Sequence, residues 1–141
     1  LLAAGRDRAR ALSPKGAVDA HLLSFGQARV KKGFMPMAVV PAAAQALERA
    51  GIRAGELASV TSHNPFAVND VYLARELKLD PERMNRHGCS LVWGHPQGPT
   101  GLRSIIELIE DLVIVGGGYG LFTGCAAGDS AAAVVLKVSA R

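Results

Sequence analysis

The chain has 141 residues, of which 49% are hydrophobic and 20% charged, a composition that indicates one well-packed domain and excludes a disordered chain. Its net charge of +4 comes from scattered Lys and Arg residues without interleaved aromatics, so we expect no nucleic-acid partner. No run of about twenty apolar residues occurs, so we expect no membrane span.

The hydrophobic periodicity and the turn residues predict alternating helices and strands. In chain order they are a helix over 6–12, a strand over 18–25, a helix over 39–50, a strand over 57–62, helices over 65–77 and 102–112, and strands over 119–125 and 131–138. We expect Gly26 to close the first strand and Gly51 to follow the second helix. The last two strands form an antiparallel hairpin. This alternation predicts an α/β layered domain.

The helix expected over 65–77 has an apolar side and a polar side. We expect the apolar side to face the core, and it carries Phe66, Val68, Val71, Tyr72 and Leu77. Asp70, Arg75 and Glu76 lie on the opposite side, which we expect to face solvent. Asn64, just before the helix, could act as its N-cap.

A first candidate for chemistry is His95, in the segment Gly-His-Pro-Gln-Gly-Pro-Thr-Gly at 94–101. It lies on a tight turn before an apolar helix, where it could serve as a base or a hydrogen-bond donor. The alternative is a histidine that only caps local backbone. The turn lacks the lysine of a phosphate-binding loop, which disfavours that kind of site.

Cys125 and His63 are the other candidates. Small neighbours surround Cys125 at the end of a predicted strand, where the thiol can face solvent, although a lone cysteine is commonly an inert core residue. His63 ends another predicted strand, where ligand-facing groups of α/β sheets gather, or it is a satisfied core or capping histidine. These groups could share proton transfer, or pair as an activated thiol and its base. The remaining candidates, which we interpret as structural, are His21, His87 and Cys89.

The two cysteines form neither a CxxC pair nor a disulfide framework. Reduced thiols in a cytosolic or matrix compartment are the simplest interpretation, and we expect a cytoplasmic protein. No pair of histidines and cysteines has zinc-finger spacing, so we expect no metal site.

Three motifs, in this order along the chain, resemble those of the thiolase superfamily. His63-Asn64-Pro65-Phe66 is similar to its Asn-Glu-Ala-Phe or His-Asp-Cys-Phe segment. The segments 85–89 and 93–101 resemble its Asn-x-x-Gly followed by Gly-His-Pro-x-Gly-x-[Ser/Thr]-Gly, and 120–127 resembles its Cys-x-Gly segment. The resemblance implies that residues 1–141 form a thiolase-like C-terminal domain, with a mixed five-stranded sheet, helices on its faces and the N-terminal nucleophile half absent.

The resemblance also implies a role for each candidate. His95 would activate the nucleophilic cysteine of the other half and help bind the thioester oxygen, Cys125 would move the proton on the acyl α-carbon, and His63 would help hold the enolate oxygen. Coenzyme A or acyl-CoA would be the substrate, without a covalently bound cofactor or a metal. Ala127 stands where the family has the glycine of Cys-x-Gly, which matters if that position needs a positive φ.

The function implied is that of an acyltransferase of lipid metabolism, which catalyses CoA-dependent thiolysis or Claisen condensation of 3-ketoacyl-CoA and acetyl-CoA. We expect the isolated chain to be inactive, the N-terminal half to be its partner, and the complete protein to be a homo-oligomer. Two alternatives stay open: a thiolase-fold enzyme of other chemistry, such as a retro-aldolase or an acyl transferase with a partner subunit, or a non-catalytic structural or binding domain. Apolar surface exposed where the other half docks predicts self-association.

Overall fold

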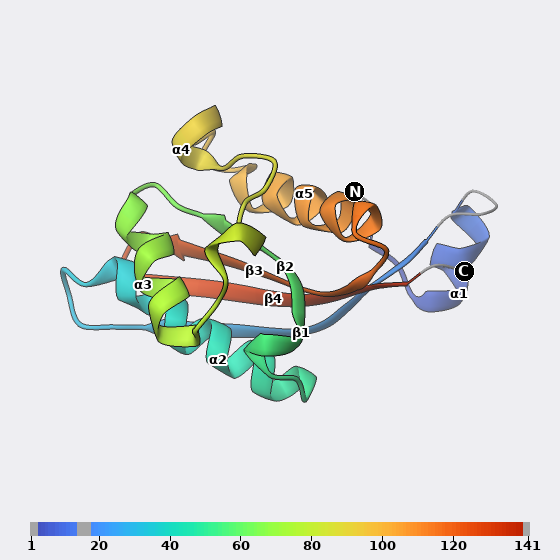
Figure 1. Ribbon diagram of the computed structural model, residues 1–141, viewed down its shortest axis with the longest axis horizontal. Helices are drawn as coiled ribbons and strands as arrows, with labels where there is room; N and C mark the ends of the chain where they lie inside the picture. Colours follow the sequence, from blue (N-terminus) through green and yellow to red (C-terminus); the bar gives the residue numbers. More distant parts are fainter. Residues whose placement is uncertain (1–2, 14–17, 140–141) are drawn as a thin grey trace.

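The computed structural model describes residues 3–13 and 18–139 and has a mixed sheet between helical layers (Figure 1). The helices are α1 (Arg6–Leu12), α2 (Val39–Ala50), α3 (Ala67–Leu77), α4 (Ser90–Trp93) and α5 (Thr100–Ile114), and the 3-10 turns are η1 (Met35–Ala38), η2 (Ala54–Glu56) and η3 (Pro81–Arg83). The strands are β1 (Asp19–Arg29), β2 (Leu57–His63), β3 (Gly118–Ala126) and β4 (Ser130–Ser139). The predicted α/β class is confirmed.

The strands lie in the order β1-β4-β3-β2. β4 runs antiparallel to both of its neighbours, and β3 and β4 form the predicted hairpin, whose turn has positive φ values at Gly128 (82°) and Asp129 (59°). β2 runs parallel to β3, with His63 in register with Gly124. The carboxyl ends of β2 and β3 therefore meet at the same edge of the sheet.

The expected fifth strand is absent from the described part of the chain, where the sheet has four strands. The only pairing on the free side of β2 among the described residues is a single parallel bridge between Val60 and Met84. η3 ends directly before Met84, which is extended, and the next residue, Asn85, has a φ of 50°, so the extended backbone at this point is one residue long. The expectation of five strands was wrong by this one element.

Gly26 does not close β1, which continues to Arg29. A Cβ at position 26 would overlap the backbone of Ala42 and Ala46 in α2. Two residues earlier, the Ser24 hydroxyl donates a 2.6 Å hydrogen bond to the Ala46 carbonyl. The glycine therefore permits close approach between α2 and the sheet, and the expectation that it ends the strand was wrong.

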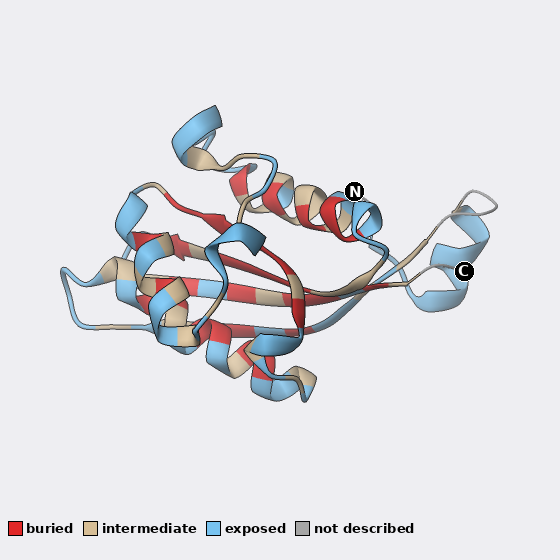
Figure 2. Cartoon of the chain, in the orientation of Figure 1, coloured by how far each residue is buried: buried red, intermediate tan, exposed pale blue. Residues whose placement is uncertain are grey.

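Two apolar clusters cover the two faces of the sheet, as the buried segments in Figure 2 show. α2 and α3 contribute to one cluster, and α5 packs on the other face through Leu108 and Leu112, which are fully buried against Phe122 of β3. Burial of each leucine contributes about 2 kcal/mol. α5 begins at Thr100, two residues before its predicted start, and its first turn thereby reaches the edge where β2 and β3 end.

The predicted inner face of α3 was wrong for most of its members, although Leu77 packs against the core, and Arg75 and Glu76 are exposed as expected. Phe66, Val68 and Val71 are exposed, whereas Asn69 and Leu73 are the buried residues of this helix. The helix begins at Ala67, not at 65, and its first turn buries a polar side chain. A pattern of apolar residues alone cannot reveal this rotation of the helix.

We expect Gly26→Ala to lower the free energy of unfolding by about 1–3 kcal/mol, because the added methyl group must displace α2 from the sheet. The matched control is Gly55→Ala, because nothing lies within 4 Å of a Cβ at that position. Urea denaturation followed by circular dichroism compares the two variants. An unchanged unfolding midpoint in Gly26→Ala would contradict the close packing of α2 on β1.

Candidate active site

A cleft of about 370 Å³ lies at the edge where β2 and β3 end. Its walls bring together the three predicted site residues from three elements: His63 ends β2, Cys125 lies on β3, and His95 lies in the loop before α5. The other lining residues are Gln97, Thr100, Gly101, Phe122, Gly124, Ala126 and Ala127. The cleft therefore collects residues that are up to 64 positions apart in the sequence, from 63 to 127.

Hydrogen bonds to Nδ1 fix the ring of His95. The Thr100 hydroxyl lies 2.9 Å from Nδ1, and the backbone N–H of Gln97 donates to the same nitrogen over 3.3 Å. Because Nδ1 accepts the Gln97 hydrogen bond, the ring proton of the neutral imidazole lies on Nε2. Gln97 has a φ of 64°, so the turn that supplies this donor is held in the left-handed region.

His63 lies against His95, with the ring centroids 4.2 Å apart. Its Nδ1 is 3.0 Å from the hydroxyl of Ser90, at the start of α4. Burial, followed by the proximity of His95, holds the pKa of His63 below its usual value. The two rings therefore form a pair in which His63 favours the neutral form.

Cys125 is 7% exposed, so the expectation of a solvent-facing thiol was wrong, although the residue does line the cleft. The side-chain amide of Asn69 donates to its sulfur, with Nδ2 and Sγ 3.4 Å apart. Burial raises the pKa of the thiol, and the Asn69 hydrogen bond opposes this rise. Ala127, at the rim, does not have a positive φ, so its side chain is compatible with the turn.

A cluster around Asp70 ties the end of β2 to α3. The carboxylate accepts hydrogen bonds from the Ser62 hydroxyl at 2.5 Å, from the Asn85 amide at 3.2 Å and from the Asn64 amide. Asn85 in turn accepts a 2.8 Å hydrogen bond from the backbone N–H of Ser62. The expectations for Asp70 as a solvent-facing residue and for Asn64 as an N-cap were therefore wrong, and Phe66 occupies the N-cap position.

A second cluster, around Asp111 of α5, holds the loop that leads to α4. Asp111 is 2% exposed and accepts hydrogen bonds from Arg86 at 2.7 Å, from His87 at 3.0 Å and from the Ser59 hydroxyl. These contacts connect β2, α5 and the loop. His87 lies in this cluster and not in the cleft lining.

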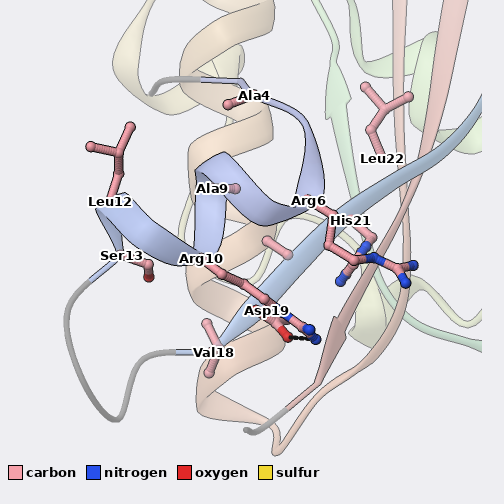
Figure 3. A pocket seen from close by; sticks show the side chains of 11 residues that line it. Ala4, Arg6, Ala9, Arg10, Leu12, Ser13, Val18, Asp19, His21 and Leu22 are labelled. Atoms are coloured by element: carbon pink, nitrogen blue, oxygen red, sulfur yellow. Dashed lines mark hydrogen bonds and ion pairs between the residues drawn. The ribbon is translucent and has the colours of Figure 1, made fainter.

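A further pocket, of about 480 Å³, lies between α1 and the start of β1 (Figure 3). It contains His21 and an ion pair of 3.0 Å between Arg10 and Asp19. It is larger than the cleft but holds none of His63, His95 and Cys125. We therefore place the candidate site at the cleft.

Sequence reasoning missed Asn69, Asp70 and Ser90 as neighbours of the site. Asn69 shares a helical face with Leu73, four positions later, but the structure alone shows that this face is buried. No signal in the sequence identifies Ser90.

Across residues 3–13 and 18–139, no group of three or more His, Cys, Asp or Glu side chains is placed to hold a metal ion, and no helix is long and apolar enough to cross a membrane.

The lowered pKa of His63 makes stability depend on pH. Unfolding restores the usual value of about 6.5, so the unfolded state binds more protons as the pH falls, and stability is lost below that pH. We expect the free energy of unfolding to decrease between about pH 7.5 and about pH 5.5, and to decrease less in His63→Gln. Urea denaturation at several pH values measures this, with His21→Gln as the control. The same pH dependence in His63→Gln and wild type would contradict it.

Comparison with known proteins agrees with the resemblance of the motifs. Residues 17–138 match the family model described as Thiolase, C-terminal domain. The chain is 34% identical to the 3-ketoacyl-CoA thiolase of Erwinia tasmaniensis, over 98% of this chain and 35% of the relative. It is also 34% identical to the beta-ketothiolase BktB of Cupriavidus necator, over 84% of this chain and 30% of the relative.

Among solved structures, the human mitochondrial 3-ketoacyl-CoA thiolase in complex with CoA is similar with a TM-score of 0.81 and 28% sequence identity. The likeness covers 85% of this chain and 30% of that chain. The chain thus spans about a third of the length of the relatives that it matches. The match to the family model over 17–138, together with the shared fold, shows that the chain belongs to the thiolase family as a thiolase C-terminal domain.

Proposed function

We propose that this chain supplies one wall of the active site of a thiolase-type acyltransferase. The complete protein would catalyse CoA-dependent thiolysis of a 3-ketoacyl-CoA, or the reverse Claisen condensation of acetyl-CoA, as a step of lipid metabolism. The observation that carries the proposal is the meeting of His63, His95 and Cys125 in one cleft. The relatives are thiolases, and one similar structure is a complex with CoA, which supports acyl-CoA as the substrate.

Cys125 acts as the base at the acyl α-carbon. In the condensation direction its thiolate takes a proton from that carbon, and negative charge develops on the thioester oxygen. A thiol whose pKa is raised by burial gives a thiolate that is a stronger base, which suits a weakly acidic carbon. In thiolysis the same proton returns from the thiol to the carbon.

The two histidines provide donors for the developing oxyanion. His95 carries its ring proton on Nε2, because Nδ1 accepts from Gln97. When the Ser90 hydroxyl donates to Nδ1 of His63, that ring also carries its proton on Nε2. Donors that are held in place before the reaction stabilise a transition-state charge more effectively than mobile water.

The nucleophile that carries the acyl group would come from the remainder of the protein. Cys89, the other cysteine, precedes α4 and is not among the residues that line the cleft. The isolated chain would therefore be inactive, and its partners would be the N-terminal thiolase half and further subunits of a homo-oligomer.

Neither a metal nor a covalently bound cofactor is required for this chemistry. We place the protein in the cytoplasm, where the unpaired thiols of Cys89 and Cys125 stay reduced.

A second candidate is a thiolase-fold enzyme of other chemistry. In the other tautomer of His63, Nδ1 donates to the Ser90 hydroxyl and Nε2 is free to remove the hydroxyl proton of a β-hydroxyacyl-CoA. With the His95 ring 4.2 Å away as a hydrogen-bond donor, this arrangement could cleave that substrate as a retro-aldolase. Cleavage of such a substrate in preference to thiolysis of a 3-ketoacyl-CoA would favour this candidate.

We expect Cys125→Ala and His95→Ala to reduce thiolysis of acetoacetyl-CoA by the full-length protein at least about a hundredfold, because each removes a proton-transfer or oxyanion group. Initial rates of thioester loss measure this. Cys89→Ala is the matched control, since Cys89 is outside the cleft lining, and its rate should stay near wild type. Near-normal turnover in Cys125→Ala or His95→Ala would refute the assigned roles.

Large apolar side chains are exposed on β1 and α4, including Leu22, Phe25 and Trp93. In the complete protein we expect other parts of the polypeptide to cover them. The chain expressed alone should therefore self-associate, because exposed large apolar side chains favour association in water. Size-exclusion chromatography with light scattering measures this. A monodisperse monomer would contradict the expectation.

A further inference from the structure

Asn69 is a polar residue at a position where a helix ordinarily buries an apolar one. It lies in the first turns of α3, is 2% exposed, and shares the inward face with Leu73. Its Nδ2 donates to the sulfur of Cys125 over 3.4 Å. Its Oδ1 accepts no hydrogen bond among the described residues.

This burial is costly for the fold. An amide carbonyl that is buried without a partner loses its hydrogen bonds to water and gains none in return, and the single hydrogen bond to a neutral thiol is weak. A leucine of similar size would pack in the same place without that cost. Stability therefore does not account for an asparagine here, whereas a role at the sulfur does.

We propose that Asn69 is a positioning residue for Cys125, whose amide N–H holds the sulfur at the cleft and stabilises its thiolate. The proposal rests on the proposed function, in which Cys125 accepts and returns the α-carbon proton. A hydrogen bond to a charged acceptor is about twice as strong as one to a neutral acceptor, so the amide favours the thiolate over the thiol. Rotation of the same amide lets Oδ1 accept from the thiol S–H, so one side chain can serve both protonation states.

The surroundings of Cys125 leave few other groups for this role. The α2 and β4 residues of its cluster are apolar: Val39, Ala42, Ala43, Ala46, Leu47, Ala131, Ala133 and Val135. His63 and His95 are the titratable groups that share the cleft. Asp70, next to Asn69, accepts hydrogen bonds from Ser62, Asn64 and Asn85.

The test is the pH dependence of alkylation by iodoacetamide, measured in the full-length protein by mass spectrometry of the peptides that contain Cys125 and Cys89. We expect Asn69→Leu to slow alkylation of Cys125 about tenfold at neutral pH and to move its midpoint to higher pH. Asn69→Asp, which keeps the shape but lacks the N–H donors, should move the midpoint in the same direction. Asn69→Gln, which restores an amide, should stay closer to wild type.

Cys89 is the internal control, because the same sample reports its alkylation and its profile should not change. Circular dichroism shows whether Asn69→Leu and Asn69→Asp fold. If one of them does not, the alkylation midpoint of Cys125 in the other one tests the proposal. A wild-type midpoint for Cys125 in folded Asn69→Leu or Asn69→Asp would overturn the proposal. Alkylation requires no turnover, so a protein that shows the shift but no thiolysis would refute the proposed function and leave the role of Asn69 at the sulfur intact.

Discussion

The parallel pairing of β2 with β3 is the constraint on which the rest of the structure depends. It puts His63 in register with Gly124, one residue before Cys125. Parallel neighbours need a crossover connection, and this one runs through residues 64–117. The crossover contains the start of α3, with Asn69, and the loop before α5, with His95. One topological requirement thereby gathers residues from distant parts of the chain at a single edge of the sheet.

Two carboxylates, the half-buried Asp70 and the buried Asp111, hold this crossover in place. Asp70 joins α3 to the end of β2, and Asp111 joins α5 to the loop that carries Arg86 and His87. A carboxylate in the last turns of a helix opposes the helix dipole by about 0.3–1 kcal/mol, and Arg86 offsets this for Asp111. Buried ionic groups of this kind add little net stability. Here they fix the geometry of the loops that surround the cleft.

The sequence predicted much of the fold because the strongest signals are local. Helices over 6–12 and 39–50 have the predicted bounds, and all four predicted strands are present. Two predictions failed because of contacts between distant parts of the chain. Gly26 does not end β1, since it lies too close to α2 to carry a side chain. The inner face of α3 differs from the predicted one, since Asn69 lies inward and donates to Cys125. The motifs identified His63, His95 and Cys125 as candidates, whereas Asn69 and Ser90 become neighbours of the site only through the packing of α3 and α4.

The cleft that we propose as the site of proton transfer at a carbon next to a thioester is lined by a buried thiol and two imidazoles. Solvent deuterium incorporation into the methyl group of acetyl-CoA tests that claim most directly, since it reports α-carbon deprotonation without requiring a complete condensation. The full-length protein should catalyse incorporation, and Cys125→Ser should abolish it. Equal incorporation by wild type and Cys125→Ser would show that Cys125 is not the base.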